Sequence, residues 1–397
     1  MRLAFFCGSL EPGRDGVGDY TRRLAAECIR LGHPCVIVAL NDLPVERPVF
    51  ESQMVEDVSI LVLRLSSLSP WNERIAEARQ WIGAFHPDWM SLQFVCFGYH
   101  RRGLCSGLGK RLAAIHPTAV WQIMFHELWL GLEANASLKH RLWGALQRSI
   151  ILDLVRRLHP RIIHTQTGAY QQVLRRENIS ASLLPLFGNI SPEPGDAWEA
   201  LLAPPVLAAV GGSPDRNQFY LAGVFGTVHP EWSAQKNVDL LLPLAQRAGR
   251  RLVLVFFGKN HLAPQALNQL KLTLRGQATV IALGEKSGPE ISQILQTLDL
   301  GLATSSRQVI QKSGTVAAML EHGLQVLVTR DDWRLAGSDF HSPAASPGLL
   351  LPDNLTGLTG LPVRNARSLA ESGARTVAEK MTMAMKLRSP ISAPVPV

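Results

Sequence analysis

Apolar runs of strand length alternate along the chain with segments in which apolar residues recur at helical spacing. Uninterrupted apolar strands separated by amphipathic helices indicate a parallel sheet that is covered on both faces. Two helices have clear ends: Tyr20–Leu31 is followed by Gly32, and Trp71–Phe85 stops before Pro87. The strands expected in the first half are Leu3–Phe6, Cys35–Leu40, Ile60–Leu63, Trp89–Phe94, Ala119–Phe125 and Ile162–Thr165.

The alternation stops near residue 190 and resumes near residue 218, across a proline-containing stretch that suits an interdomain connection. A second series of strands and helices follows. The expected elements are Phe219–Phe225, Asn237–Arg247, Leu252–Phe257, Ala263–Leu274, Thr279–Leu283, Pro289–Leu298, Leu300–Ala303, Gly314–His322 and Gln325–Val328. A last helix, at about Ala366–Leu387, could pack back across both series.

The chain is therefore predicted to contain two tandem, doubly wound α/β domains, and its 397 residues exceed one ordinary hydrophobic core. The predicted divisions are an N-terminal domain at 1–190, a linker at 191–217, a C-terminal domain at 218–365, and a helix with a disordered tail at 366–397.

Composition is that of a globular protein, with 46% hydrophobic and 18% charged residues. No apolar run approaches the roughly 18 residues of a membrane-spanning helix, and the N-terminus resembles a first strand more than a signal peptide. All five cysteines lie between Cys7 and Cys105, without a CxxC pair. This pattern favours reduced core thiols in a cytoplasmic protein that binds no metal through cysteine.

The formal net charge is +8, and the first half holds most of the clustered cations. These cations either form a solvated basic surface or attract an anionic partner, such as a phosphorylated substrate or membrane headgroups. Peripheral contact with the inner face of the cell membrane is therefore possible. Aromatic residues do not interleave with these cations, so no nucleic acid partner is expected.

In open α/β sheets, ligands bind beyond the carboxyl ends of the strands, where the next helix begins. The first such junction contains Gly13, Gly16 and Gly18, which would let the backbone approach an anionic group at the helix start. Their spacing is not the dinucleotide-binding fingerprint, and turn formation alone would also explain them.

Two further junctions of the first half carry side chains that suit a sugar. Gln93 ends a strand, and the stretch to Tyr99 offers amide and aromatic groups, although any pocket can use them. His126 follows another strand and could donate a hydrogen bond or a charge to a substrate, with Glu127 orienting a neighbour. The alternative is a helix-initiating pair with an internally bonded histidine.

In the second half, three strand ends are followed by glycine-containing turns. Gly226 and Thr227 lead to Lys236 at a helix start, where a cation and free amides would hold a diphosphate. Gly258 also follows a strand and is followed by a lysine, Lys259. The backbone from Leu283 to Glu285 could line the edge of a nucleobase.

The last junction reads Lys312-Ser313-Gly314-Thr315. Ser313 and Thr315 are natural N-cap types, and Gly314 allows a close backbone approach. A lysine beside the positive end of a helix dipole is unfavourable unless an anion binds nearby, although a solvated lysine is the simpler alternative. Together with Lys236, Lys312 would form a diphosphate clamp.

With these residues, the chain resembles the GT-B glycosyltransferases, in particular the retaining family 4 (group 1) enzymes. Residues 16–20 leading to 31–33 are similar to that family's N-terminal loop and first helix. Residues 225–236 are similar to its donor-diphosphate loop, and 313–326 to its donor-binding helix and following strand. The resemblance covers nearly the whole chain and lies in order and spacing more than in any single motif.

The resemblance implies two Rossmann-like domains with a cleft between them. It implies a nucleotide-diphosphate sugar on the C-terminal domain and a hydroxyl acceptor, a glycan, a lipid-linked molecule or a small natural product, on the N-terminal domain. Hexosyl transfer would proceed with retention and without metal or cofactor, because two lysines and helix amides would neutralise the leaving diphosphate. Such reactions build polysaccharides and glycoconjugates.

The site residues follow from the junctions and the resemblance together. The catalytic candidates are His126, Glu127, Lys236 and Lys312, and His126 matches a position where the family often places a histidine facing the transferred sugar. The donor-binding candidates are Gly226, Thr227, Gly258, Leu283, Glu285, Ser313, Gly314, Thr315 and Glu321. The acceptor-binding candidates are Gly16, Gly18, Gln93 and Tyr99.

Two positions depart from the family pattern. Thr227 stands where the family usually has arginine after the glycine of the diphosphate loop. The family's two glutamates have seven residues between them and would fall at Gln311 and Met319, or the second at Ala318 when counted back from Gly323. Glu321 is the acid nearest to the second position.

Three other classes of function fit parts of the sequence. A non-catalytic binding or scaffold protein could keep the GT-B shape while losing the arginine and glutamates. A sugar-nucleotide epimerase would release an altered sugar nucleotide without any acceptor. A dehydrogenase is least favoured, because neither glycine loop has dinucleotide spacing.

Overall fold

The computed structural model describes residues 1–212, 215–259, 262–338, 340, 347–355, 358, 360–362, 364 and 373–388. The chain forms two compact units. Unit 1 comprises Met1–Pro185, Arg334–Phe340 and Ala374–Val397, and unit 2 comprises Leu186–Trp333 and His341–Gly373. Within the described residues, no helix combines the length and the apolar character that crossing a membrane requires.

Unit 1 is built on an eight-stranded sheet in the order β3-β4-β2-β1-β5-β6-β7-β8. Every neighbouring pair is parallel except β3 and β4, which form an antiparallel hairpin at one edge. The strands are β1 (Leu3–Cys7), β2 (Cys35–Asp42), β3 (Val49–Val55), β4 (Val58–Ser66), β5 (Trp89–Phe94), β6 (Trp121–Phe125), β7 (Ile162–Thr165) and β8 (Ser182–Leu183).

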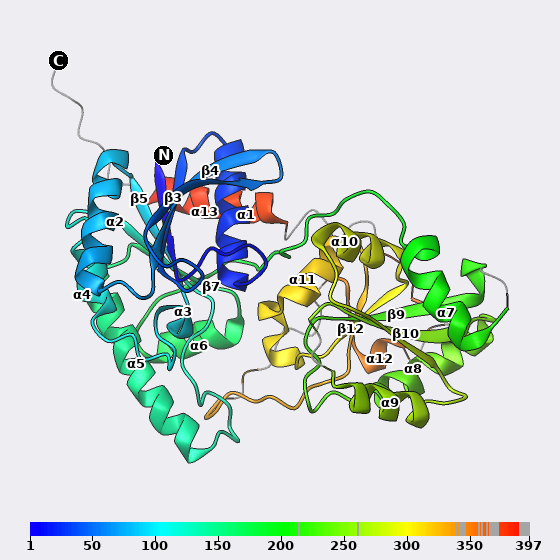
Figure 1. Ribbon diagram of the computed structural model, residues 1–397. Helices are drawn as coiled ribbons and strands as arrows, with labels where there is room; N and C mark the ends of the chain where they lie inside the picture. The colour runs from blue at the N-terminus through cyan, green and yellow to red at the C-terminus, as the bar shows by residue number, and fades with distance from the viewer. Residues whose placement is uncertain are drawn as a thin grey trace. The chain divides into compact units, whose positions relative to one another are not determined.

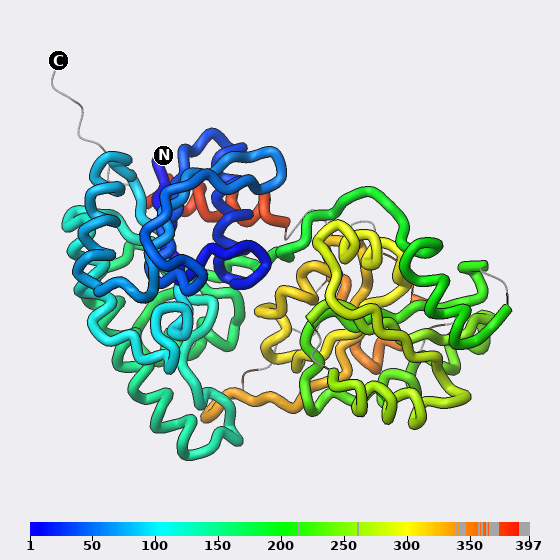
Figure 2. Tube along the Cα trace, viewed as in Figure 1, coloured from blue at the N-terminus to red at the C-terminus, as the bar shows by residue number. Residues whose placement is uncertain are grey.

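Helices lie on both faces of this sheet, with α2, α4 and α5 on one side and α1 on the other (Figure 1). The last helix, α13, packs against α1 although more than 300 residues separate them along the chain, as Figure 2 shows. The helices of unit 1 are α1 (Gly16–Arg30), α2 (Trp71–Phe85), α3 (Cys96–Tyr99), α4 (Leu108–Ala113), α5 (Leu138–Leu158), α6 (Gly168–Arg176) and α13 (Ala374–Leu387).

Unit 2 has a six-stranded parallel sheet in the order β11-β10-β9-β12-β13-β14. Its strands are β9 (Phe219–Phe225), β10 (Arg251–Phe257), β11 (Thr279–Gly284), β12 (Leu300–Ala303), β13 (Val326–Val328) and β14 (Leu349–Leu350). Its helices are α7 (Ala203–Val210), α8 (Ala234–Arg247), α9 (Pro264–Thr273), α10 (Gly288–Thr297), α11 (Gly314–Glu321) and α12 (Pro352–Leu355), with shorter helical turns at Trp198–Leu202, Arg216–Gln218 and Arg307–Lys312.

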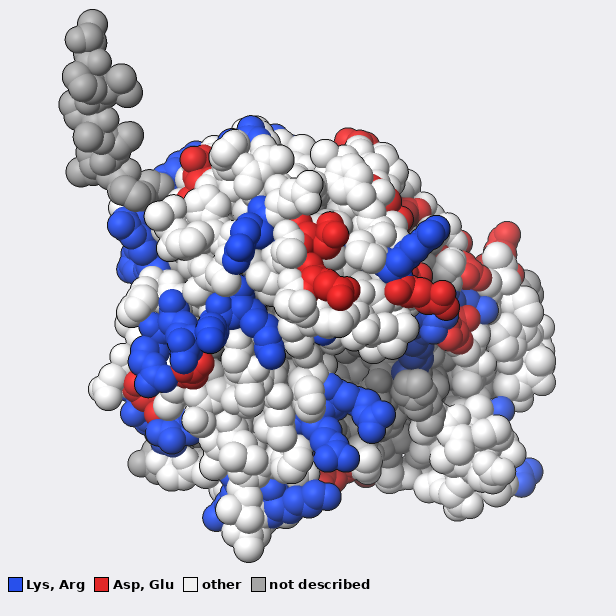
Figure 3. Space-filling view, turned by 60° about the vertical axis from the view of Figure 1, so that its left-hand side comes forward, with Lys and Arg blue, Asp and Glu red and all other residues white. Residues whose placement is uncertain are grey.

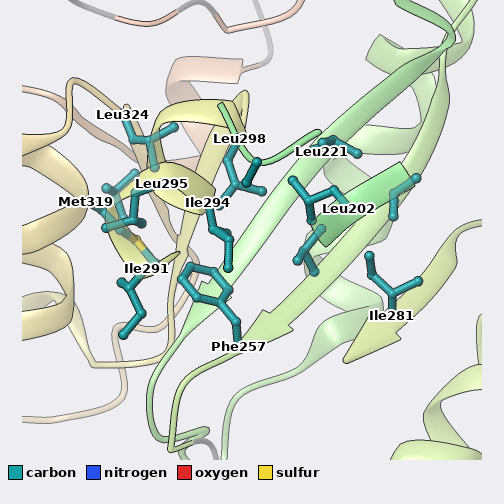
Figure 4. Packing of buried hydrophobic residues seen from close by; sticks show 14 of the residues in the cluster. Leu202, Leu221, Phe257, Ile281, Ile291, Ile294, Leu295, Leu298, Met319 and Leu324 are labelled. Carbon is teal, nitrogen blue, oxygen red and sulfur yellow. The ribbon is translucent and has the colours of Figure 1, made fainter. Parts of the chain in front are cut away.

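Alternate residues of β9 and β10 fill two separate cores, because successive side chains of a strand point to opposite faces. Phe219 and Leu221 belong to the core beneath α7, α10 and α11, which also contains Leu202 and Met319 (Figure 4). The intervening Tyr220 belongs to the core beneath α8 and α12. Burial on both faces explains why these strands are apolar throughout.

The structure confirms the expected fold class, two doubly wound α/β domains with parallel sheets. Five elements have the expected bounds: Trp71–Phe85, Trp89–Phe94, Ile162–Thr165, Phe219–Phe225 and Leu300–Ala303. The segment 191–217, expected to be a connection, contains the helical stretch from 198 to 210, with Leu202 and Val206 fully buried. Of the expected helix at 366–387, residues 366–372 lie outside the described residues, as does the tail beyond 388.

Helix α1 begins four residues before the expected position because Asp15 caps it, accepting a hydrogen bond from the Gly18 amide at 2.6 Å. Gly18 also packs against the preceding loop. A Cβ atom at this residue would lie 2.3 Å from the carbonyl oxygen of Ser9. The turn between β1 and α1 therefore closes only over a glycine.

We expect Gly18→Ala to lower the free energy of unfolding by about 1–3 kcal/mol, because the added methyl displaces backbone. Gly83→Ala is the matched control: Gly83 is also helical, in α2, and no atom lies within 4 Å of the position that its Cβ would take. That control should raise stability by up to about 1 kcal/mol through helix propensity. Urea titration measures both, and equal effects would contradict the steric argument.

Candidate functional site

The sheet of unit 2 has a topological switch point between β9 and β12. From β9 the chain proceeds outward to β10 and β11, and from β12 it proceeds in the opposite direction to β13 and β14. Loops that leave two such neighbouring strands diverge, and ligands of open α/β sheets bind at this carboxyl edge. Most of the second-half candidates lie on the loops at this edge.

Gly226 follows β9 with φ of 79°, and its amide donates to the Phe257 carbonyl at 3.0 Å. Gly258 follows β10 with φ of 81°, and its amide donates to the Gly284 carbonyl at 2.9 Å. Hydrogen bonding thus continues past the strand ends and holds three consecutive loops together. Positive φ at both positions favours glycine.

Gly226 also touches the start of α11, since a Cβ atom there would lie 2.7 Å from Cγ2 of Thr315. Ser313 caps that helix, accepting from the Val316 amide at 3.4 Å, and its hydroxyl lies 3.1 Å from that of Thr315. No atom lies within 4 Å of the Cβ position of Gly314, so the first turn faces open space. The structure therefore brings Gly226, Ser313, Gly314 and Thr315 together.

Lys312 directly precedes the N-cap and is half-buried at the end of a 3-10 turn. Lys236 lies at a second helix start, in the first turn of α8, where Ser233 caps its amide at 3.2 Å. The Lys236 ammonium donates to the Thr329 carbonyl at 2.9 Å, which leads it toward the end of β13. Each lysine thus accompanies the positive end of a helix dipole.

Two threonines that the sequence analysis did not single out connect these loops. Thr304, directly after β12, donates from Oγ1 to the Thr227 carbonyl at 2.9 Å, joining the two sides of the switch point. Thr329, directly after β13, accepts at Oγ1 from the buried Asn237 amide at 3.1 Å. The sequence could have indicated both threonines, because each is the first polar residue after a buried strand.

The remaining donor candidates lie further along the edge. Thr227 Oγ1 makes a long hydrogen bond of 3.5 Å to the Lys259 carbonyl. Glu285 forms an exposed ion pair with Lys259, at 3.3 Å between Nζ and Oε1. Leu283 is half-buried at the end of β11.

Glu321 has a structural environment at the other end of α11. Its side chain is buried, and Oε1 accepts from the Gly188 amide at 3.0 Å. A Cβ atom at Gly188 would lie 2.6 Å from Cα of Ala318, so this backbone presses directly on the helix. The expectation that Glu321 helps to bind a donor does not fit this environment, because the carboxylate holds residue 188 instead.

Unit 1 has its own switch point, between β1 and β5. The loops after these strands touch, since a Cβ atom at Gly8 would lie 2.5 Å from the Gly98 carbonyl oxygen. Gly16 is exposed in the first turn of α1, whereas Gly18 is buried against the loop. Gly16 is therefore the acceptor-binding candidate of this loop that solvent reaches.

His126 follows β6 and is enclosed by polar side chains. Its Nδ1 lies 2.9 Å from Nε2 of Gln166, which donates to it, and its Nε2 lies 2.9 Å from Oε1 of Gln93, to which it donates. Tyr20 packs edge-on against the ring, with centroids 4.8 Å apart. Burial lowers the pKa of His126 to about 3.

This environment corrects the expectation that His126 offers a charge to a substrate. The imidazole is neutral at physiological pH, and both ring nitrogens are engaged within unit 1. Gln93 and Tyr99 also point inward: both are buried, and the Tyr99 hydroxyl donates to the Gln93 carbonyl at 3.2 Å. The sequence analysis expected Gln93 and Tyr99 to line an acceptor site, but both support the loop after β5 from within. Glu127, in contrast, is exposed.

The polar contacts of His126 continue across three strands. Gln93 donates to Ser91 at 2.8 Å, Ser91 donates to Gln122 at 2.5 Å, and Gln122 Nε2 lies 3.1 Å from His164 Nδ1. All of these side chains are buried. Burial is also the main cause that lowers the pKa of His164 to about 4. A continuous row of neutral, bonded groups thus runs through the sheet.

No model of a protein family matches the sequence, and no curated protein sequence matches it either. Among solved structures, HepE of Anabaena in complex with UDP aligns over 98% of this chain and 100% of its own, with a TM-score of 0.60 and 11% identity. HepE in complex with UDP and glucose aligns over the same shares, with a TM-score of 0.54 and 14% identity.

A third similar structure is the α,α-trehalose-phosphate synthase (UDP-forming) of Burkholderia xenovorans in complex with glucose-6-phosphate. It covers 97% of this chain and 100% of its own, with a TM-score of 0.52 and 12% identity. At such identities the likeness shows the fold. The chain thus has the GT-B fold, two Rossmann-like domains in tandem.

The contact between Gly226 and Thr315 can be tested with a matched pair of glycines. Gly226→Ala and Gly284→Ala both place a side chain at positive φ, which costs about 1–2 kcal/mol, but no atom surrounds the Cβ position of Gly284. We expect Gly226→Ala to be the more destabilising in urea titrations. Adding Thr315→Ser, which removes Cγ2, should restore part of the difference. No recovery would contradict the contact.

The buried histidines predict a pH dependence of stability. Their pKa values are depressed in the fold, to about 3 and about 4, so the unfolded chain binds their protons first as pH falls below about 6.5. The contribution of the two histidines to the free energy of unfolding is thus fully present above about pH 6.5 and decreases as the pH falls toward the folded pKa values. We expect a loss of about 1 kcal/mol per histidine between about pH 7.5 and about pH 5.5.

Urea titrations at several pH values measure this slope. His164→Asn should remove one histidine's share of the slope, whatever its effect on stability at neutral pH. His140→Asn, at an exposed position, is the control and should keep the full slope. The interpretation fails if His164→Asn leaves the slope unchanged.

Proposed function

We propose that this chain is a glycosyltransferase that transfers a sugar from a nucleotide-diphosphate sugar to a hydroxyl acceptor. The observation that carries the proposal is the open first turn of α11 at the switch point of unit 2. There Gly314 faces open space, Ser313 and Thr315 present hydroxyls, and Lys312 precedes the helix. The shared fold with HepE, solved with UDP and glucose, supports a nucleotide-sugar ligand.

The diphosphate of the donor would bind at this helix start. Free backbone amides and the positive end of the dipole favour an anion there. Lys236 would contribute from α8: its ammonium has three donors, and the bond to the Thr329 carbonyl uses one. Lys312 would add a second positive charge.

These groups would also promote the chemical step. When the sugar–phosphate bond breaks, negative charge develops on the leaving diphosphate, and fixed donors that stabilise that charge lower the barrier. Lysines and amides would take the role that a divalent cation has in other transferases, so we propose a metal-independent reaction. Retention at the sugar carbon is part of the same proposal and rests on the family resemblance.

The other parts of the substrates would lie beside this centre. The backbone near Gly258 and from Leu283 to Glu285 would border the nucleobase, at the neighbouring strand ends. The acceptor would bind at the carboxyl edge of unit 1, near Gly16 and Glu127. A neutral His126 would contribute there by holding Gln93 and Gln166 in place.

The double variant Lys236→Ala/Lys312→Ala tests the diphosphate site. We expect one of UDP, GDP, ADP and dTDP to raise the melting temperature of the unaltered protein, because a bound ligand stabilises the fold by about 2.7 kcal/mol at 100 times its Kd. The double variant should lose that shift. It should also reduce sugar transfer by at least about 100-fold, the typical loss when an oxyanion donor is removed.

Lys271→Ala/Lys380→Ala is the matched control, since both lysines are exposed on other helices, α9 and α13. It should keep the nucleotide shift. If no nucleoside diphosphate stabilises the unaltered protein, a non-catalytic scaffold explains the chain better. Release of an altered sugar nucleotide without any acceptor would indicate an epimerase instead.

A further inference from the structure

The longest helix of unit 1 carries an apolar row on its solvent side. Leu138, Leu142 and Leu146, in the first half of α5, are 73%, 62% and 52% exposed. A spacing of four residues places them on one face of the helix, along about 12 Å of its length. The buried residues of α5 lie on the opposite face: Gly144, Gln147, Ile151, Leu154 and Leu158.

The buried face of α5 is well packed, so the exposure of the three leucines does not result from a loosely packed helix. A Cβ atom at Gly144 would lie 1.9 Å from the carbonyl oxygen of Leu130, and Gln147 accepts from the Leu130 amide at 2.9 Å. Arg141 donates to the Ala134 carbonyl at 2.8 Å, and Trp143 donates to the Arg102 carbonyl at 2.9 Å. Two loops therefore clamp the start of the helix and fix its orientation.

Cations surround the leucine row. Helix α5 contains five Lys or Arg residues and one acid, Asp153; Arg156 and Arg157 form ion pairs with that acid, and Arg148 forms one with Glu177. Lys139 and Arg141 flank Leu138, and the bond from Trp143 brings the exposed pair Arg101 and Arg102 beside the helix. Figure 3 shows many Lys and Arg side chains gathered on this side of unit 1, with uncharged surface and a few acids between them. One acid, Glu133, lies in the loop that packs on the helix start.

We propose that this face of α5 docks on an anionic membrane surface. A helix lying in the interface plane inserts its apolar side chains below the headgroups, while Lys and Arg contact the lipid phosphates. Each cation near such a surface adds to the attraction. We assign this face to lipid because three leucine side chains form a much smaller apolar area than the roughly 800 Å² per partner that a stable protein interface buries.

This inference is independent of the proposed function, because membrane binding can be measured without a sugar donor. Full-length protein is floated with vesicles of phosphatidylcholine alone and with vesicles that also contain about 30% phosphatidylglycerol. We expect binding to the anionic vesicles and a clear reduction at about 1 M salt, where the Debye length falls to roughly 3 Å.

The triple variant Leu138→Ser/Leu142→Ser/Leu146→Ser should reduce partition at least about tenfold. The matched control is Leu68→Ser/Leu272→Ser/Leu387→Ser, three leucines that are 65–77% exposed elsewhere; it should bind like the unaltered protein. Circular dichroism of both variants establishes that they fold. Equal binding of the triple variant and the control would overturn the proposal.

Insertion itself can be read by fluorescence. The native cysteines are buried, so Leu142→Cys provides one exposed thiol for an environment-sensitive dye, and Leu272→Cys is its control. A blue shift with anionic vesicles is expected at residue 142 alone. No shift there overturns the proposal. So does a leucine-dependent dimer in sedimentation without vesicle binding, which would assign the face to a second copy of the chain.

Discussion

At the switch point of each sheet, the loop that follows a central strand lies in direct contact with the start of a helix or with neighbouring backbone. The candidate sites depend on this contact. In unit 1 the loop after β1 lies so close to α1 that no side chain fits at Gly18. In unit 2 the loop after β9 meets the start of α11, where Gly226 lies against the side chain of Thr315. Because neither glycine carries a side chain, each loop lies close to the start of a helix, and helix starts favour anions.

The two units use this geometry with different electrostatics. At the edge of unit 2, two lysines accompany two helix starts, and the ammonium of Lys236 donates to the Thr329 carbonyl after β13. In unit 1, a row of buried, neutral polar groups runs through the sheet from His164 to His126 and Gln166, and its members are bonded to one another. Unit 2 is therefore suited to hold negative charge, and unit 1 to keep a rigid shape.

The exposed face of α5 is formed by residues outside these candidate sites, yet its rigidity has a similar origin. Gly144 lets the Leu130 carbonyl lie directly on the helix, and the resulting contact orients three leucines outward. Exposed apolar residues are ordinary when scattered. Here they are aligned, held by a fixed backbone and bordered by cations, and that combination is what an interfacial helix requires.

The sequence by itself determined the fold class, because strands buried on both faces must be apolar throughout and are easy to recognise between amphipathic helices. It also located the strand-to-helix junctions, including Gly226 and residues 312–315. It did not reveal the hairpin strand β3, because only two of its seven residues are buried and they form no apolar run. Nor did it separate Lys236, which remains exposed, from Glu321, which is buried against residue 188.

Only the tertiary structure decided these points, because the charge of a side chain and its availability depend on neighbours that are distant in the sequence. His126 follows its strand as any site histidine would, but Gln93 and Gln166 come from other strand ends and burial keeps the ring neutral. Local patterns record how a segment is buried. They do not record which partner occupies each hydrogen-bonding group once the sheet has assembled.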